Sequence, residues 1–204
     1  MQKIWVKGKR YAKFLCQFAW EKIRGLDFTL PAASEEVKQS DCYNGYCKTP
    51  EKHVEMLLRS LGIPYSESAF LDIGCGKGAV LRVAKQFPFR RVAGVELDKE
   101  LVETARRNMR ILGLRDVECI WGNALEFGRY KEFNVFFLFN PFSYEILEQV
   151  LGKILASLEG DSRQIYILYH HPLHYQLMEQ AGLRRTGVLY DKLKDYETYI
   201  YSNC

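Results

Sequence analysis

The chain has 204 residues, of which 48% are hydrophobic and 14% aromatic, so it can form one globular domain with a full core but not two. Its 29 basic residues face 25 acidic ones, and this net charge of +4 is too small to indicate a nucleic-acid-binding protein. The six cysteines show no C-x-x-C pair, so no metal site is expected. Free thiols and the lack of a long apolar run favour a cytoplasmic protein with no transmembrane segment.

The first 30 residues differ from the rest because seven basic residues stand against only Glu21 and Asp27. An apolar stripe with helical spacing runs through Tyr11, Phe14, Leu15 and Phe18, which predicts an amphipathic helix. Such a basic helix could contact a membrane surface, RNA or a partner protein. Most amphipathic helices cover a core, so we expect this stripe to pack on the domain.

Residues 31–49 lose this period and predict a loop with a turn at Asn44-Gly45. Thr49-Pro50-Glu51 then predicts the start of a helix, with Thr49 as its N-cap, that continues to about Leu61. We therefore divide the chain into a basic helical extension with a loop, residues 1–44, and a main domain, residues 45–204.

Strands and helices alternate from residue 70 onward. The predicted strands are 70–73, 91–95, 117–121, 133–139 and 164–170, followed by a hairpin of 183–191 and 197–202. The predicted helices are 78–87, a helix between Asp98 and Gly113, 144–158 and 174–181. This alternation is typical of βαβ units and a mainly parallel α/β sheet.

The segment most informative about function is Leu71-Asp72-Ile73-Gly74-Cys75-Gly76-Lys77-Gly78, which follows a strand and opens a helix. In a doubly wound sheet this turn lies at the carboxyl end of the first strand, where ligands bind. A dinucleotide site would require G-x-G-x-x-G, and a P-loop would require Ser or Thr after Gly-Lys. Neither pattern is present.

The string from Phe70 to Gly78 resembles the first motif of class I S-adenosylmethionine-dependent methyltransferases, and the resemblance extends over about residues 45–204. It implies a Rossmann-like, seven-stranded doubly wound sheet of order 3-2-1-4-5-7-6 with one antiparallel strand. It also implies an enzyme that uses S-adenosylmethionine, releases S-adenosylhomocysteine and needs no metal.

The expected cofactor contacts lie at successive strand ends. Asp72 would compensate the ammonium of the methionine end, and Glu96 would accept hydrogen bonds from the ribose hydroxyls. Asp98 competes for that role, but its place at a helix start favours an N-cap. Leu97 would pack on the adenine, and the resemblance implies that Asn123 and the next backbone N–H bond the base. The expected cofactor-binding residues are Thr49, Asp72, Gly74, Cys75, Gly76, Gly78, Glu96, Leu97, Asn123, Ala124 and Asn140.

Asn140-Pro141-Phe142 resembles the Asn/Asp-Pro-Pro-aromatic motif of amino-group methyltransferases, with one Pro missing. In that motif the Asn oxygen orients the target amine, and Phe142 could stack on a planar substrate. Related enzymes cover cofactor and substrate with the segment that here contains Tyr43, Asn44, Tyr46 and Thr49. The expected catalytic residues are Asn140, Pro141, Phe142 and Tyr46.

His170, His171 and His174 follow the fifth strand, and one of them could act as a general base. Exposed turn histidines without a role are commoner, and no acidic or Cys partner for a metal lies nearby in sequence.

The methyl acceptor stays open at this point. An amine on a protein or a small molecule is favoured by the Asn-Pro-Phe segment. The alternatives are O-methylation of a glycan or small-molecule hydroxyl, RNA methylation supported only by the basic N-terminus, and a non-catalytic module that binds S-adenosylmethionine.

Overall fold

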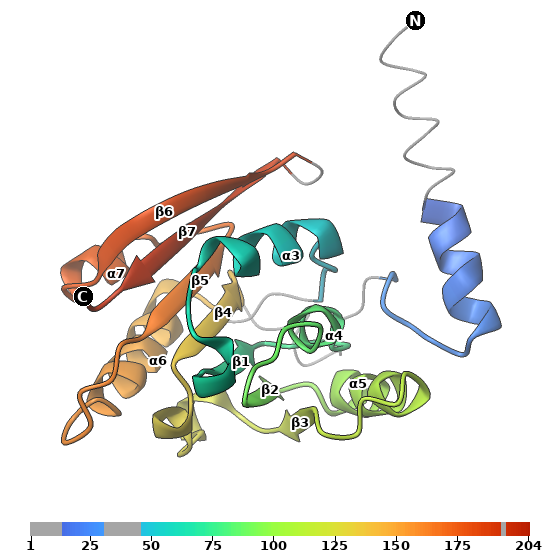
Figure 1. The fold of residues 1–204 in the computed structure, drawn as a ribbon, viewed down its shortest axis with the longest axis horizontal. Coiled ribbons are helices and arrows are strands. Elements are labelled where there is room, and N and C mark those ends of the chain that lie inside the picture. The colour runs from blue at the N-terminus through green and yellow to red at the C-terminus, as the bar shows by residue number, and fades with distance from the viewer. Residues whose placement is uncertain (1–13, 31–45, 193–194) are drawn as a thin grey trace, which may run out of the picture.

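The computed structural model describes residues 14–30, 46–192 and 195–204. Its centre is a seven-stranded sheet of order β3-β2-β1-β4-β5-β7-β6 (Figure 1). The strands are β1 (Ala69–Ile73), β2 (Arg91–Glu96), β3 (Glu118–Trp121), β4 (Val135–Phe139), β5 (Tyr166–His170), β6 (Arg184–Asp191) and β7 (Tyr196–Ser202). From β3 to β5 neighbouring strands are parallel, whereas β7 runs antiparallel to both β5 and β6. The predicted order and single antiparallel strand are confirmed.

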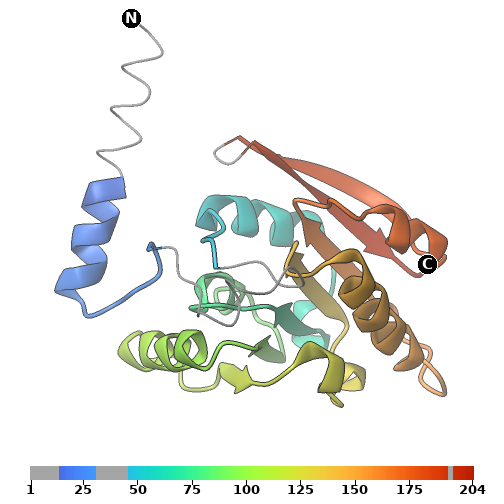
Figure 2. The same ribbon diagram turned by 180° about the vertical axis from the view of Figure 1, so that it is seen from behind.

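Helices cover both faces of the sheet. They are α3 (Glu51–Ser60), α4 (Ala79–Ala84), α5 (Lys99–Ile111), α6 (Tyr144–Ala156) and α7 (Gln176–Gln180), with short 3-10 turns at Tyr65–Glu67, Ala124–Glu126 and Tyr130–Glu132. Buried residues of α3, α4 and α5 belong to one hydrophobic cluster, and those of α6 and α7 belong to a second cluster on the opposite face. Figures 1 and 2 show these layers from the two sides of the molecule.

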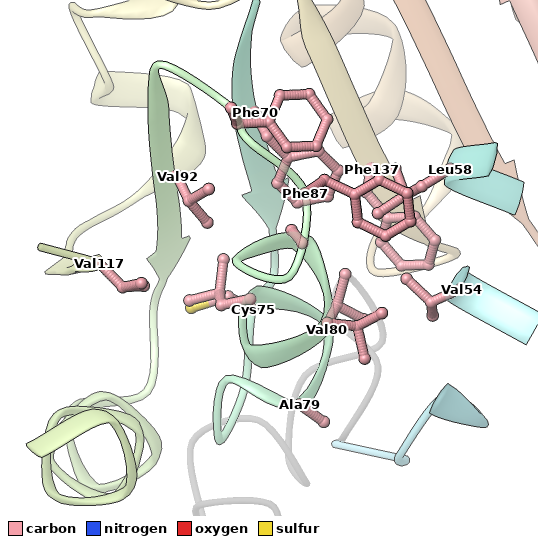
Figure 3. Packing of buried hydrophobic residues seen from close by; sticks show 14 of the residues in the cluster. Val54, Leu58, Phe70, Cys75, Ala79, Val80, Phe87, Val92, Val117 and Phe137 are labelled. Atoms are coloured by element: carbon pink, nitrogen blue, oxygen red, sulfur yellow. The ribbon is translucent and has the colours of Figure 1, made fainter. Parts of the chain in front are cut away.

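Successive strand residues contribute to opposite cores, because side chains alternate across a strand. Phe70 of β1 and Phe137 of β4 pack with α3 and α4 on one face (Figure 3), whereas Leu71 and Phe136 pack on the other. Strands buried on both faces read as continuous apolar runs. Burying one such side chain contributes about 1.5–3 kcal/mol to the free energy of folding. Parallel pairing of β1 with β4 places their carboxyl ends side by side.

Helix ends differ from the sequence predictions in detail. Asp98 is the N-cap of α5, and its side chain accepts hydrogen bonds from the N–H groups of Glu100 (2.9 Å) and Leu101 (3.2 Å), as predicted. Thr49 is not an N-cap, since α3 begins after Pro50 without a side-chain cap. Helix α4 is shorter than the predicted 78–87 and ends at Ala84.

Residues 14–23 form a helix at the side of the domain. The prediction that its apolar stripe packs on the domain is wrong for the described part, because Phe14 and Leu15 are exposed. The residues that pack are farther along: Leu26 and Phe28 are buried in the same core as α3 and α4. Of the other predicted features, Tyr11, Tyr43 and the Asn44-Gly45 turn lie outside the described residues.

Candidate functional site

The glycine turn between β1 and α4 needs its glycines for two reasons. Gly76 has φ +51°, in the left-handed region, and a Cβ there would lie 2.1 Å from Cδ2 of Tyr46. A Cβ on Gly74 would lie 3.0 Å from Cβ of Pro141, which follows β4. The turn therefore sits beneath the Tyr46 ring and directly beside the Asn140-Pro141 segment.

Glu96, at the end of β2, ties this turn to the start of α5. Its carboxylate accepts hydrogen bonds from the backbone N–H of Gly76 (2.8 Å) and of Asp98 (3.0 Å). Burial raises the pKa of Glu96 from its usual range. A carboxylate offers about four acceptor positions, so two remain for the neighbouring hydroxyls of a ribose.

Asp72 is the second carboxylate at this edge of the sheet, and it is buried, with only 3% of its surface exposed. Burial raises its pKa well above the usual range, and the charge of Glu96 adds to this effect. Two carboxylates held close together away from water are stabilised by a cation. The pair therefore fits a cofactor that carries an ammonium and a sulfonium.

A cavity of about 320 Å³ lies over the carboxyl ends of the strands. Of the residues expected to bind the cofactor or to act in catalysis, all except Gly78 line this cavity. Gly78 instead occupies the N-cap position of α4 with φ +82°. Residues from β1, β2, β4 and the loops after them thus converge, as the parallel sheet requires.

The adenine end of the cavity would lie between β2 and β3. Leu97 lines it, and its carbonyl accepts a hydrogen bond from Nε1 of Trp121 (3.0 Å). The Oδ1 of Asn123 accepts from the N–H of Leu125 (2.9 Å), so this side chain caps the 3-10 turn that follows. A carbonyl oxygen has a second lone pair, and capping therefore leaves Asn123 able to bond a base.

Tyr46 forms the wall of the cavity above the glycine turn. Its hydroxyl donates to the carbonyl of Phe28 (2.6 Å), so it is directed to the N-terminal segment. The Nζ of Lys77 lies 5.5 Å from the centre of the Tyr46 ring. Thr49, which is buried, continues the same wall. This geometry favours a covering role for Tyr46 and not proton transfer.

Asn140 begins the acceptor end. Its φ of +36° is unusual for a residue with a side chain, and Asn is among the residues that tolerate such values best. Its Oδ1 accepts a hydrogen bond from the hydroxyl of Tyr169 (3.0 Å). The Tyr169 hydroxyl in turn accepts a hydrogen bond from the backbone N–H of His174 (3.4 Å). Burial raises the pKa of Tyr169 to about 12, so the hydroxyl keeps its proton and remains a donor. The amide of Asn140 is therefore held in one orientation.

The three histidines have different environments. His170 is the last residue of β5, fully buried, with Nδ1 2.7 Å from Oγ1 of Thr198. It is therefore not the exposed turn residue considered from sequence, because β7 covers it. His174 packs against the ring of Tyr144 and is not among the lining residues. His171 lines the cavity, and partial burial lowers its pKa.

Aromatic residues that the sequence did not single out complete the acceptor end. His171 stacks on Tyr196 with ring centres 3.9 Å apart, and Phe139 lies edge-on to the same tyrosine at 5.9 Å. Leu173 and the largely buried Phe142 line the cavity beside them. Phe139 could have been found from its place next to Asn140. Tyr196 could not, because it belongs to β7, far along the chain.

Within residues 14–30, 46–192 and 195–204, no group of three His, Cys, Asp or Glu side chains could hold a metal ion. None of the helices described there is long and apolar enough to cross a bilayer.

Comparison with known proteins agrees with this geometry. Residues 70–160 match the model of a methyltransferase domain family. The chain is 26% identical over 133 residues to a ribosomal protein L11 methyltransferase of Fusobacterium nucleatum, a match that covers 64% of this chain and 36% of the relative. It is 32% identical over 79 residues to the protein of that name from Clostridium botulinum, covering 39% and 22%. The chain thus spans about a third or less of the length of these curated relatives.

Two solved structures share the fold. A SAM-dependent methyltransferase from Aquifex aeolicus superposes with a TM-score of 0.62 at 16% identity, covering 74% of this chain and 89% of that one. An RNA methyltransferase from Salinibacter ruber, solved with S-adenosyl-L-homocysteine, gives 0.56 at 23%, covering 76% and 92%. Together with the sheet order and the glycine turn, these findings show that residues 70–160 carry a methyltransferase domain and that the chain has the class I fold of S-adenosylmethionine-dependent methyltransferases.

Proposed function

We propose that the protein transfers the methyl group of S-adenosylmethionine to an amine nitrogen of a protein or a small molecule. The observation that carries this proposal is the placement of Asn140. It lines the cavity next to the glycine turn, and Tyr169 fixes its amide. An amide oxygen held in this way can accept an N–H of the target amine and direct the nitrogen lone pair toward the methyl group.

The residues of the chain divide the remaining work. When bound, S-adenosylmethionine supplies an activated methyl group on a sulfonium. Asp72 and Glu96 hold the charged and hydroxylated parts of that cofactor. Phe139, Phe142 and Tyr196 exclude water from the acceptor end, and an apolar environment lowers the pKa of an amine so that it can bind uncharged. Catalysis then rests on alignment and desolvation.

The curated relatives support a protein acceptor, because both are named ribosomal protein L11 methyltransferases. Their match covers the methyltransferase domain and leaves most of each relative unmatched. We therefore propose the class of acceptor, an amine, and not that particular protein. The ribosomal protein in the relatives' names supports the further proposal that the reaction takes place in the cytoplasm.

O-methylation is the second candidate, and His171 is the observation that favours it. This imidazole lines the acceptor end, and its lowered pKa keeps it neutral near pH 7, so it can accept the proton of a hydroxyl. If the acceptor is a hydroxyl, His171→Gln should abolish turnover. If it is an amine, the loss should be only a few-fold.

The test begins with calorimetry of S-adenosylmethionine, NAD and ATP. Labelled S-adenosylmethionine is then incubated with protein and cell extract, which is fractionated into protein, RNA, glycan and small molecules. We expect label in protein or in small amines, with nitrogen as the modified atom by mass spectrometry. Label on oxygen or in RNA would contradict the amine acceptor. Tight binding of the cofactor without any transfer would favour the non-catalytic module.

Asn140→Gly is the variant that tests the role of the Asn140 amide. Glycine accepts the positive φ, so the substitution removes the amide without adding backbone strain. Turnover should fall about tenfold to a hundredfold, while the cofactor dissociation constant changes little. The opposite pattern would assign Asn140 to the cofactor alone. Asn203→Gly, at an exposed position near the C-terminus, is the matched control.

A further inference from the structure

The helix of residues 14–23 contacts the domain with its polar edge. The carboxylate of Glu21 is 2% exposed, accepts from the N–H groups of Phe28 (3.0 Å) and Thr29 (2.8 Å), and pairs with Nζ of Lys48 (3.1 Å). One turn earlier, Nε2 of Gln17 donates to the side chain of Glu51 (3.4 Å). These bonds fix which side of the helix faces the domain.

The opposite side carries large apolar side chains into solvent. We call it the outer face and define it by Leu15, Trp20 and Ile23. All three are exposed, and Ile23 is 87% exposed. Figures 1 and 2 show the helix beyond α4 and α5, at the end of the molecule opposite β6. Several exposed large apolar side chains on one short helix indicate a surface that binds a membrane or another molecule.

The charged side chains that residues 14–30 fully expose are both positive. Both acids of this part of the chain turn inward, since Glu21 pairs with Lys48 and Asp27 with the buried Lys77 (2.8 Å). Lys22 and Arg24 stay exposed. Over residues 1–30 the sequence has seven basic and two acidic residues, whereas the rest of the chain has 22 basic and 23 acidic. The excess of basic charge thus belongs to the same 30 residues of the sequence that contain the outer face.

We propose that the outer face docks on the surface of a lipid bilayer that contains anionic phospholipid. A helix lying in the headgroup region can bury Leu15 and Ile23 among acyl chains while Lys22 contacts phosphates. Aromatic side chains such as Trp20 favour this boundary because one part of the ring system is apolar and one is polar.

RNA or a second copy of the chain would interact favourably with only part of the outer face. Phosphates of RNA would satisfy Lys22 and Arg24 but would leave Leu15 and Ile23 in water. A second copy of the chain would bring two strongly basic segments together, which electrostatic repulsion opposes. A bilayer satisfies both the apolar and the basic groups.

The experiment uses the full chain and two kinds of vesicle, phosphatidylcholine alone and phosphatidylcholine mixed with phosphatidylglycerol. We expect co-sedimentation with the mixed vesicles only, weakened by high salt, with a blue shift of tryptophan emission that Trp20→Phe removes. The double variant Leu15→Glu, Ile23→Glu should lower the partition coefficient tenfold or more, because both apolar anchors are lost and two negative charges are added.

Val188→Glu is the matched control, since Val188 is half exposed on β6 and lies far from the outer face. It should leave vesicle binding unchanged. An equal loss in this control, equal binding to both kinds of vesicle, or binding to RNA or a protein without binding to vesicles would overturn the proposal. The double variant should bind S-adenosylmethionine with unchanged affinity, which shows that it is folded and separates this test from that of the proposed function.

Discussion

The two ends of the cavity are built in different ways. The proposed cofactor end is a charged site with two carboxylates, the buried Asp72 and the partly buried Glu96, and the N–H groups of Gly76 and Asp98 hold the Glu96 carboxylate in place. The acceptor end consists of aromatic and aliphatic walls around one oriented amide, that of Asn140. Every carboxylate that lines the cavity, among the residues that the structure describes, belongs to the cofactor end. We therefore propose that charge selects the cofactor, whereas shape and a single amide select the acceptor.

Removal of Glu96 should damage the cofactor end most. Glu96→Ala leaves the N–H groups of Gly76 and Asp98 without their acceptor and deletes the expected ribose contact. A hydrogen bond to a charged group contributes about 1.5–3 kcal/mol, so the loss of two bonds to the ribose should lower the affinity for S-adenosylmethionine about a hundredfold or more by calorimetry. Glu100→Ala, at an exposed position of α5, is the control. Unchanged affinity in Glu96→Ala would show that this carboxylate does not determine cofactor binding.

A side chain at Gly76 should have the next largest effect. Gly76→Ala adds backbone strain at φ +51° and pushes the Tyr46 ring out of the wall. Cofactor affinity should fall about tenfold to thirtyfold. Adding Tyr46→Ala removes the steric conflict and leaves the backbone strain, so the double variant should lose less than the two single losses combined. Strict additivity in this cycle would show that Tyr46 does not cover the turn.

Tyr169→Phe tests the acceptor end alone. The variant removes the donor that orients Asn140, a bond of about 1 kcal/mol, so kcat should fall about fivefold with no change in cofactor affinity. Tyr201→Phe is a close control: Tyr201 is equally buried in the same core, and its hydroxyl has no hydrogen-bond partner among the described residues. A fall in kcat in both variants would mean that packing, not orientation, sets the rate.

The smallest effect should be on pH dependence. The folded, ligand-free protein holds the pKa of Asp72 above its ordinary value of 3.8, so Asp72 destabilises this state progressively as pH rises through that window. A cationic ligand requires the ionised form. Cofactor affinity should therefore rise, about threefold, as pH increases through the raised pKa, and binding should release protons. Calorimetry in two buffers of different ionisation enthalpy measures this release, and Asp72→Asn should reduce it. Proton uptake instead would contradict the electrostatic account of the cofactor end.

The residues that line the proposed cofactor end were predictable because their positions depend on local sequence. The glycine turn follows β1 within a few residues, and Glu96 and Asn123 each stand where a strand ends. Parallel pairing then brings these short segments together without further information.

The acceptor end was predictable only in part, because its walls depend on long-range pairing. Tyr196 reaches the cavity because β7 inserts between β5 and β6, and the same insertion buries His170 against Thr198. The direction of the N-terminal helix was predicted wrongly for a similar reason. Its apolar stripe is visible in sequence, but the ion pair between Glu21 and Lys48 that turns the stripe outward is not.

The ion pair between Lys77 and Asp27 limits how far the N-terminal part of the chain can be shortened. The ammonium of Lys77, inside the glycine turn, also donates to the carbonyl of Leu30 (3.0 Å), and Asn108 of α5 bonds the backbone of Asp27 in both directions. A chain trimmed to residue 45, the boundary that the sequence predicts, would leave this buried cation without either partner. An unpaired buried charge is costly. Residues 26–30 therefore help to stabilise the glycine turn of the proposed cofactor site. A shortened enzyme intended for crystallisation or engineering should begin before residue 26.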